Sequence, residues 1–108
     1  MRVSELIDKY GMKALSLPDP DREIAGGYCG DLLSWVMGRA RQDNAWITIM
    51  SNMNVVAVAS LSDVSCVILA EGVALEQSVT ETAEAKGVNV LTCEKGAFEI
   101  AALLAPDV

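Results

Sequence analysis

The sequence predicts a three-layer α/β/α protein with a mostly parallel sheet. Residues 46–50 are rich in β-branched and aromatic side chains, as strands prefer. Residues 66–70 form an unbroken apolar run, typical of a strand covered on both faces. The stretch between them has the length of a right-handed crossover, which needs roughly a dozen residues. Helical and strand patterns alternate along the chain, which favours a parallel sheet with helices on both faces.

Residues 55–61 lie inside this crossover and are apolar almost throughout. Their composition would also suit a strand, but the βαβ spacing favours a short helix that Asn52 or Asn54 caps. A helix that is apolar all round must be buried on both sides. The sheet covers one side, and we expect a second copy of the chain to cover the other, through Val55 and Val58.

The N-terminal part is expected to add two helices and two strands. Ser4 is a plausible N-cap for the first helix, and Gly11 ends it. Asp31 is a plausible N-cap for the second helix. The expected elements are a helix over 3–10, strands over 12–17 and 23–26, and a helix over 31–41.

The C-terminal part continues the alternation. Gly87 stops one helix, and Pro106 follows the last one. The expected elements are a helix over 75–86, a strand over 88–92 and a helix over 97–104.

Trp35 lies beside the apolar stripe of the helix over 31–41, next to Gly38 and Arg39. One interpretation is a Trp partly covered by its own chain. The other is an interface anchor, since Trp and Arg are enriched in interfaces. Hydrophobic residues make up 52% of the chain and the mean hydropathy is +0.33, which is high for a small monomer and favours a homodimer.

The length of 108 residues predicts a single domain over 1–108. No apolar run approaches the roughly 20 residues of a membrane span, and no signal peptide is visible, so we expect a cytoplasmic protein without a membrane partner. The net charge is −7, and no basic patch is visible, which argues against nucleic acid as a partner.

The residue types exclude several chemistries. The chain has no histidine, so histidine bases, Ser-His-Asp triads and histidine metal ligands are absent. Its three cysteines, Cys29, Cys66 and Cys93, are widely spaced and do not form the pattern of a metal or iron–sulfur site. We therefore expect no enzyme activity, no metal and no cofactor.

The carboxyl ends of the predicted strands are the expected ligand site, because open α/β sheets bind ligands there. Glycines, a thiol and polar side chains gather at these ends. The candidate ligand-binding residues are Gly26, Gly27, Cys29, Asp31, Asn52 and Asn54. An alternative is a nucleotide- or cofactor-binding protein that uses the same ends, with Cys29 as a reactive or ligand thiol, although no phosphate-binding motif is present.

Six segments of the sequence carry a family resemblance. They are VSELI at 3–7, DREI at 21–24, GGY at 26–28, GDLLS at 30–34, WITI at 46–49 and NVVAVASL at 54–61. With these segments, nearly the whole chain resembles the small stand-alone members of the DRTGG-domain family. It is also similar to the N-terminal domain of HPr kinase/phosphorylase. The Asp-Arg-Thr-Gly-Gly string that names the family is absent.

The resemblance implies a regulatory or accessory domain with the α/β architecture of that N-terminal domain. It implies no catalytic residues, because the phosphate-binding loop of the kinase lies in its other domain. Some members resemble accessory proteins of iron-only hydrogenase systems, which implies a link to such systems. The expected function is a non-enzymatic homodimer that binds a small ligand or a protein partner.

Overall fold

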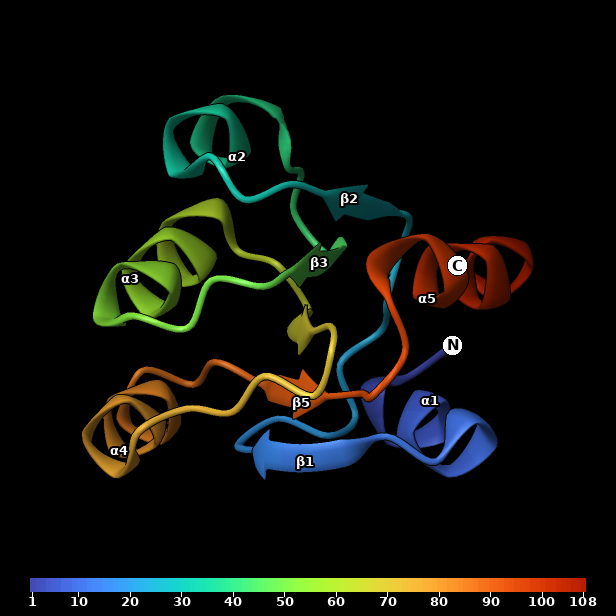
Figure 1. The fold of residues 1–108 in the computed structure, drawn as a ribbon, viewed down its shortest axis with the longest axis horizontal. Helices are drawn as coiled ribbons and strands as arrows, with labels where there is room; N and C mark the ends of the chain where they lie inside the picture. The colour runs from blue at the N-terminus through green and yellow to red at the C-terminus, as the bar shows by residue number, and fades with distance from the viewer.

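The computed structural model describes all of residues 1–108 and has five strands and five α-helices (Figure 1). A short 3₁₀ turn, Ala105–Asp107, ends the chain. The helices are α1 (Val3–Tyr10), α2 (Leu33–Arg39), α3 (Met53–Ser62), α4 (Gln77–Ala85) and α5 (Ala97–Leu104), and the strands are β1 (Lys13–Ser16), β2 (Gly27–Cys29), β3 (Ala45–Thr48), β4 (Cys66–Leu69) and β5 (Val90–Thr92).

The strands form one sheet in the order β1-β5-β4-β3-β2. The four strands from β2 to β5 are parallel to one another, and β1 pairs with β5 in the antiparallel sense. The carboxyl ends of the four parallel strands therefore share one edge of the molecule. β1 and β2 are the two outer strands.

Helices cover both faces of this sheet, with α2, α3 and α4 on one face and α1 and α5 on the other (Figure 1). Because side chains alternate along a strand, each central strand feeds both cores. Trp46 packs toward α3, while its neighbours Ala45 and Ile47 pack toward α1 and α5. This three-layer, mostly parallel architecture confirms the predicted fold class.

One predicted strand is in the wrong place. Residues 23–26 were expected to form it, but the strand begins at Gly27. Glu23 instead makes an isolated antiparallel bridge with Arg2, and the Ile24 N–H donates to the Met1 carbonyl oxygen over 2.8 Å. Contacts with the N-terminus thus take up the backbone that the sequence pattern assigned to the sheet.

The central helix is covered differently from the prediction. Asn52 does cap α3, since its side-chain oxygen accepts from the Asn54 N–H over 3.0 Å. Val55 and Val58 are only 1% and 6% exposed within one copy, so assigning them to an interface was wrong. They pack in the core between α3 and the sheet, and α2 and α4 flank the helix.

Two predicted helix caps were also wrong. The N-cap of α1 is Arg2 rather than Ser4, and its N–H donates to the Glu5 carboxylate over 3.0 Å. The N-cap of α2 is Leu32, which makes no side-chain cap bond. Asp31 therefore does not cap α2.

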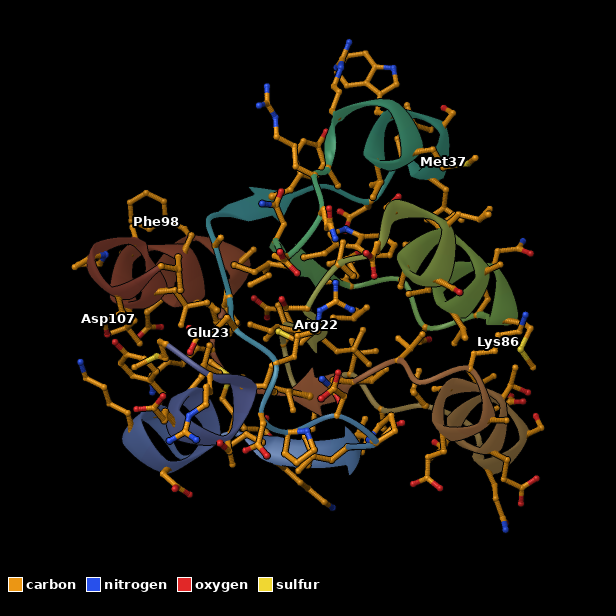
Figure 2. All side chains as sticks on the ribbon, turned by 180° about the vertical axis from the view of Figure 1, so that it is seen from behind. Arg22, Glu23, Met37, Lys86, Phe98 and Asp107 are labelled. Carbon is orange, nitrogen blue, oxygen red and sulfur yellow. The ribbon has the colours of Figure 1, made fainter.

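At the opposite, amino-end edge of the sheet, Arg22 ties two turns together (Figure 2). Its Nη2 donates to Asp43 Oδ1 over 2.9 Å and to Asp63 Oδ1 over 2.8 Å. Both aspartates have positive φ angles, 66° and 54°. The guanidinium thus holds the turn before β3 and the turn after α3 in a backbone conformation that non-glycine residues rarely adopt.

Candidate functional site

The structure separates the six candidate ligand residues. Gly26 precedes β2 and so lies at the amino end of that strand, away from the expected edge. Its φ is 73°, and the Cβ atom of a side chain added there would lie 3.2 Å from the side-chain nitrogen Nδ2 of Asn44. Gly26 therefore serves the turn into β2. Gly27 is the first residue of β2, paired with Ala45.

Asp31 lies at the expected edge, but its carboxylate is already engaged. Asp31 Oδ1 accepts a hydrogen bond from the Thr48 hydroxyl over 2.7 Å and another from the Ile49 N–H over 3.0 Å. The side chain thus joins the segment after β2 to the end of β3. Oδ1 thus serves as a structural tie between the two strands.

Asn52 lies beside a shallow hollow of about 350 Å³ between the N-terminal ends of α3 and α4. The other polar residues in its lining are Ser51, Glu76 and Ser78. Asn54 is exposed in the first turn of α3 and does not line this hollow. Since the Asn52 side-chain oxygen caps α3, its amide NH₂ is the part that is left for a ligand.

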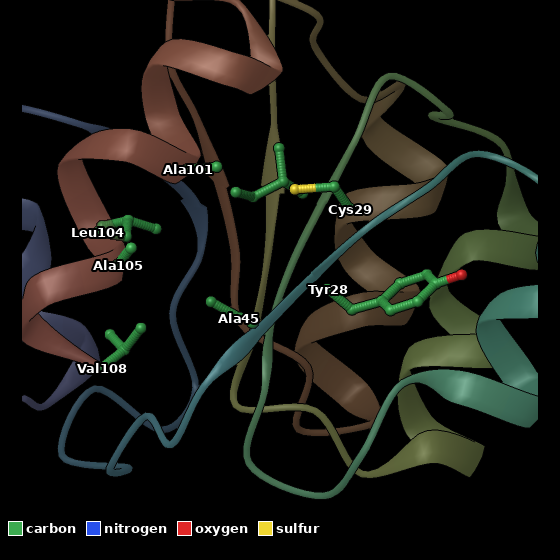
Figure 3. A pocket seen from close by; sticks show the side chains of 9 residues that line it. Tyr28, Cys29, Ala45, Ala101, Leu104, Ala105 and Val108 are labelled. Carbon is green, nitrogen blue, oxygen red and sulfur yellow. The ribbon is translucent and has the colours of Figure 1, made fainter.

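Gly27 and Cys29 line a separate hollow between β2 and α5, with a volume of about 160 Å³. Figure 3 shows the Cys29 sulfur pointing toward α5, while the ring of Tyr28 points the opposite way. Apart from Gly27, the lining is hydrophobic, with Tyr28, Cys29, Ala45, Ile47, Ala101, Leu104, Ala105 and Val108.

The sequence reading missed the part of this hollow that comes from the C-terminal helix. Ala101 and Ala105 are four residues apart, so they lie on the same side of the helix. Small side chains at both positions leave space between the helix and the strand edge. The alanines at positions 101 and 105, in and just after the last predicted helix, were the signal available in the sequence.

The Cys29 thiol is poorly suited to nucleophilic chemistry. Burial raises its pKa above the ordinary value, and the nearby Asp31 carboxylate raises it further. The thiolate is the nucleophilic form, so a raised pKa lowers the reactive fraction at neutral pH. Burial also raises the pKa of the Cys66 thiol to about 12.

A third hollow, of about 250 Å³, carries positive charge. Lys13 and Lys95 both line it, and neither ammonium group has a carboxylate within ion-pairing distance. It lies where β5 ends and β1 begins, and its lining also includes Glu94 and Cys93. The sequence reading singled out neither lysine as a ligand residue.

Large exposed apolar side chains gather on one side of the molecule. Trp35 is 53% exposed, and the Arg39 guanidinium lies 3.6 Å from the centre of its ring system. Six of the seven exposed large hydrophobic residues belong to α2, α3 or the segments leading into them, namely Leu32, Trp35, Met37, Ile49, Met53 and Leu61. The seventh is Phe98 on α5, which is 90% exposed.

Two further features bear on the kind of site. No cluster of three or more Cys, Asp or Glu side chains is arranged to hold a metal ion. None of the helices combines the length and the apolar character that crossing a membrane requires.

Among solved structures, the fold is similar to the CBS and DRTGG domains of the regulatory region of Clostridium perfringens pyrophosphatase. That crystal structure is a complex with the activator diadenosine tetraphosphate. The TM-score is 0.73 at 14% sequence identity, and the match covers 95% of this chain and 45% of the other. The two proteins thus share a fold, and this chain spans less than half the length of that one.

Comparison with curated proteins finds no match. The family model of the DRTGG domain, in contrast, matches residues 29–106, which is well over half of the chain. This match begins at the last residue of β2 and takes in β3 to β5 and the helices α2 to α5. The chain therefore belongs to the DRTGG domain family.

Proposed function

We propose that this chain is a non-enzymatic regulatory or accessory module that works by binding, as a homodimer. The observation that carries the proposal is the exposed apolar surface of α2 and the neighbouring segments. Monomeric proteins rarely expose large contiguous apolar patches unless these serve binding. Trp35 and Leu32 are 53% and 58% exposed, and Trp is among the residues that most often anchor interfaces.

Two observations support binding rather than catalysis. Cys29 is the one cysteine residue classed as exposed, yet partial burial of its thiol raises the pKa, and the chain has no histidine that could act as its base. The regulatory setting of the similar pyrophosphatase domains supports the same class of function. We accordingly expect no ATP hydrolysis and no stable iron–sulfur cluster. The cytoplasmic location and the link to hydrogenase systems remain predictions.

The hollow between β2 and α5 is the ligand site that we favour. Its lining is hydrophobic and carries no charged side chain, so it suits a small, uncharged and largely apolar molecule. Gly27 and Cys29 are the two predicted ligand residues that it contains. A protein partner with an apolar surface would use the α2 side instead.

A second candidate function is binding of a nucleotide or another small anion. Lys13 and Lys95 favour it, because two unpaired ammonium groups beside one hollow attract phosphate or carboxylate groups. Calorimetric titration with ATP, and with phosphate alone, tests this candidate. Binding that is lost in Lys13→Gln and Lys95→Gln, but kept in Lys86→Gln, would favour the anion site.

Sedimentation equilibrium of the unmodified chain at micromolar concentration tests the homodimer. A mass twice that of the 11.5 kDa chain is the expected result. A single species at 11.5 kDa would contradict the homodimer, and the apolar surface would then be left for a different protein partner.

A further inference from the structure

We propose that two copies join through the free edge of β2, as antiparallel neighbours, so that the two sheets become one continuous sheet. This inference rests on the proposed homodimer and names the surface that forms it. β2 pairs on one side only, with β3, and no other strand lies beyond it.

The backbone of β2 offers free hydrogen-bonding groups on its outer side. The Gly26 carbonyl accepts from the Ala45 N–H over 3.0 Å, and the Gly30 N–H donates to the Ile47 carbonyl oxygen over 3.1 Å. Since backbone groups alternate sides along a strand, those of Gly27 and Cys29 point away from β3. Both residues are exposed, so nothing in one copy covers these groups.

This edge is complementary to itself. With Tyr28 placed opposite Tyr28 of a second copy, Gly27 lies opposite Cys29 of that copy, and Cys29 opposite its Gly27. Each such pair exchanges two N–H···O bonds, so one two-fold axis yields four hydrogen bonds. Glycine opposite cysteine also leaves room for the thiol.

Apart from its short length of three residues, the β2 edge lacks the devices that keep outer strands from pairing. Lysine, proline and inward-pointing charges usually protect a free edge. Residues 24–30 contain none of them and carry no charge, although the chain as a whole has a net charge of −7. The strand itself therefore adds no charge repulsion between two acidic copies.

Exposed apolar side chains flank the edge on both faces of the sheet, which favours a second copy over a peptide as the occupant. Trp35 in α2 and Leu32 at its N-cap lie on one face, and Phe98 in α5 lies on the other. Figure 2 shows Phe98 on the side of α5 that faces away from α1, at the level of β2. An added peptide strand would leave both helices uncovered, whereas a second copy brings its own α2 and α5 to meet them.

The hollow beside β2 fits this arrangement. One hollow has about 160 Å³, which is below the roughly 300–1,000 Å³ typical of small-molecule pockets. A two-fold axis perpendicular to the sheet keeps the α5 side of both copies on the same face of the joined sheet. The two hollows therefore lie side by side on that face. Together they reach the lower end of that range, so the small-molecule site is incomplete in one copy.

Proline at Cys29 tests the pairing. Cys29→Pro removes the N–H that points away from β3 and leaves the hydrogen bonds to β3 in place. Edge strands accept proline where the backbone N–H faces solvent, so the variant should fold. We expect Cys29→Pro to be folded by circular dichroism and to sediment as a monomer. The matched Cys29→Val variant keeps the N–H and should sediment as a dimer.

Crosslinking of the otherwise unmodified chain gives an independent readout if Cys29→Pro does not fold. The two Cys29 residues lie diagonally across the axis, roughly 7–8 Å apart, with their Cβ atoms somewhat closer than that. A short bismaleimide should therefore yield a covalent dimer that is kept in Cys93→Ser and lost in Cys29→Ser. A dimer that persists in Cys29→Pro and gives no Cys29 crosslink would overturn edge pairing and leave the homodimer standing. A monomeric unmodified chain would overturn both.

Discussion

Asp31 and Thr48 join the carboxyl ends of two neighbouring parallel strands, with the Thr48 hydroxyl donating to Asp31 Oδ1 over 2.7 Å. The same carboxylate oxygen accepts from the Ile49 N–H over 3.0 Å. Close by, the Trp46 indole N–H donates to the Gly30 carbonyl oxygen over 2.9 Å. These bonds hold the edge strand β2 against β3 just beyond the three residues over which the strands pair.

Removing the Asp31 side chain should therefore destabilise the fold. A hydrogen bond to a charged group contributes about 1.5–3 kcal/mol to stability, and less where water reaches the group. Because the Asp31 site is only partly buried, we expect Asp31→Ala to lower the free energy of unfolding by about 1–2 kcal/mol. Asp31→Asn keeps an acceptor oxygen and should lose less. Urea unfolding with an unchanged m-value is the measurement. Equal losses in the two variants would show that charge, rather than the acceptor, matters.

The sequence predicted the type and order of the elements because their patterns are local. Apolar runs such as the one over 66–70 and stop signals such as Gly11 depend little on distant residues. The start of β2 does depend on them. The N-terminus captures Glu23 and Ile24, and this shifts the strand onto Gly27, a residue with low strand propensity.

The site was less predictable, for similar reasons. Asp31 has the chemistry of an N-cap, yet its partner Thr48 lies 17 positions along the chain. Val55 and Val58 were assigned to an interface because their helix is apolar all round. In the structure, small residues such as Ala57 and Ser60 face outward, so the helix needs little additional cover.

Val58 should be intolerant of charge because it packs in the core. Val58→Asp buries a carboxylate without a partner, and we expect a loss of about 3–5 kcal/mol, enough to unfold much of the protein. Leu61 on the same helix is 74% exposed, so Leu61→Asp should leave the stability nearly unchanged. Thermal unfolding followed by circular dichroism compares the two. A folded Val58→Asp protein would mean that this face of α3 is open to water.

Arg22 should not be replaceable by lysine. Its guanidinium contacts Asp43 and Asp63 together, and one ammonium group cannot reproduce that fork. We expect Arg22→Lys to lose about 1–2 kcal/mol in urea unfolding, given that both aspartates are partly exposed. The control is Arg2→Lys, at an exposed ion pair with Glu5 that should contribute little. Similar losses at both positions would contradict the special role of Arg22.

The C-terminus should loosen in acid. The hydrogen bond from Lys9 Nζ, 2.7 Å long, and then that from the Tyr10 hydroxyl hold the pKa of Asp107 below its ordinary value of 3.8. A lowered pKa in the folded state stabilises the protein above pH 3.8, and this contribution is lost as the pH falls through the folded value. Asp107→Asn should lower Tm at pH 7, and its difference from the unmodified chain should shrink in acid. A difference that is constant with pH would show that the charge of Asp107 contributes nothing.

Trp35 should matter for association and hardly at all for folding. It is 53% exposed and stacks with Arg39, so its truncation removes little from the core. If it anchors the homodimer, Trp35→Ala removes an interface hot spot of about 2 kcal/mol, which corresponds to a dimer Kd roughly 30-fold higher. Leu61→Ala is the matched control, because Leu61 is exposed and apolar but lies on α3, one helix further from the β2 edge. Sedimentation across a concentration series measures both Kd values. Equal Kd values for Trp35→Ala and the unmodified chain would place the dimer contact elsewhere, and the exposed indole would then be left for a different protein.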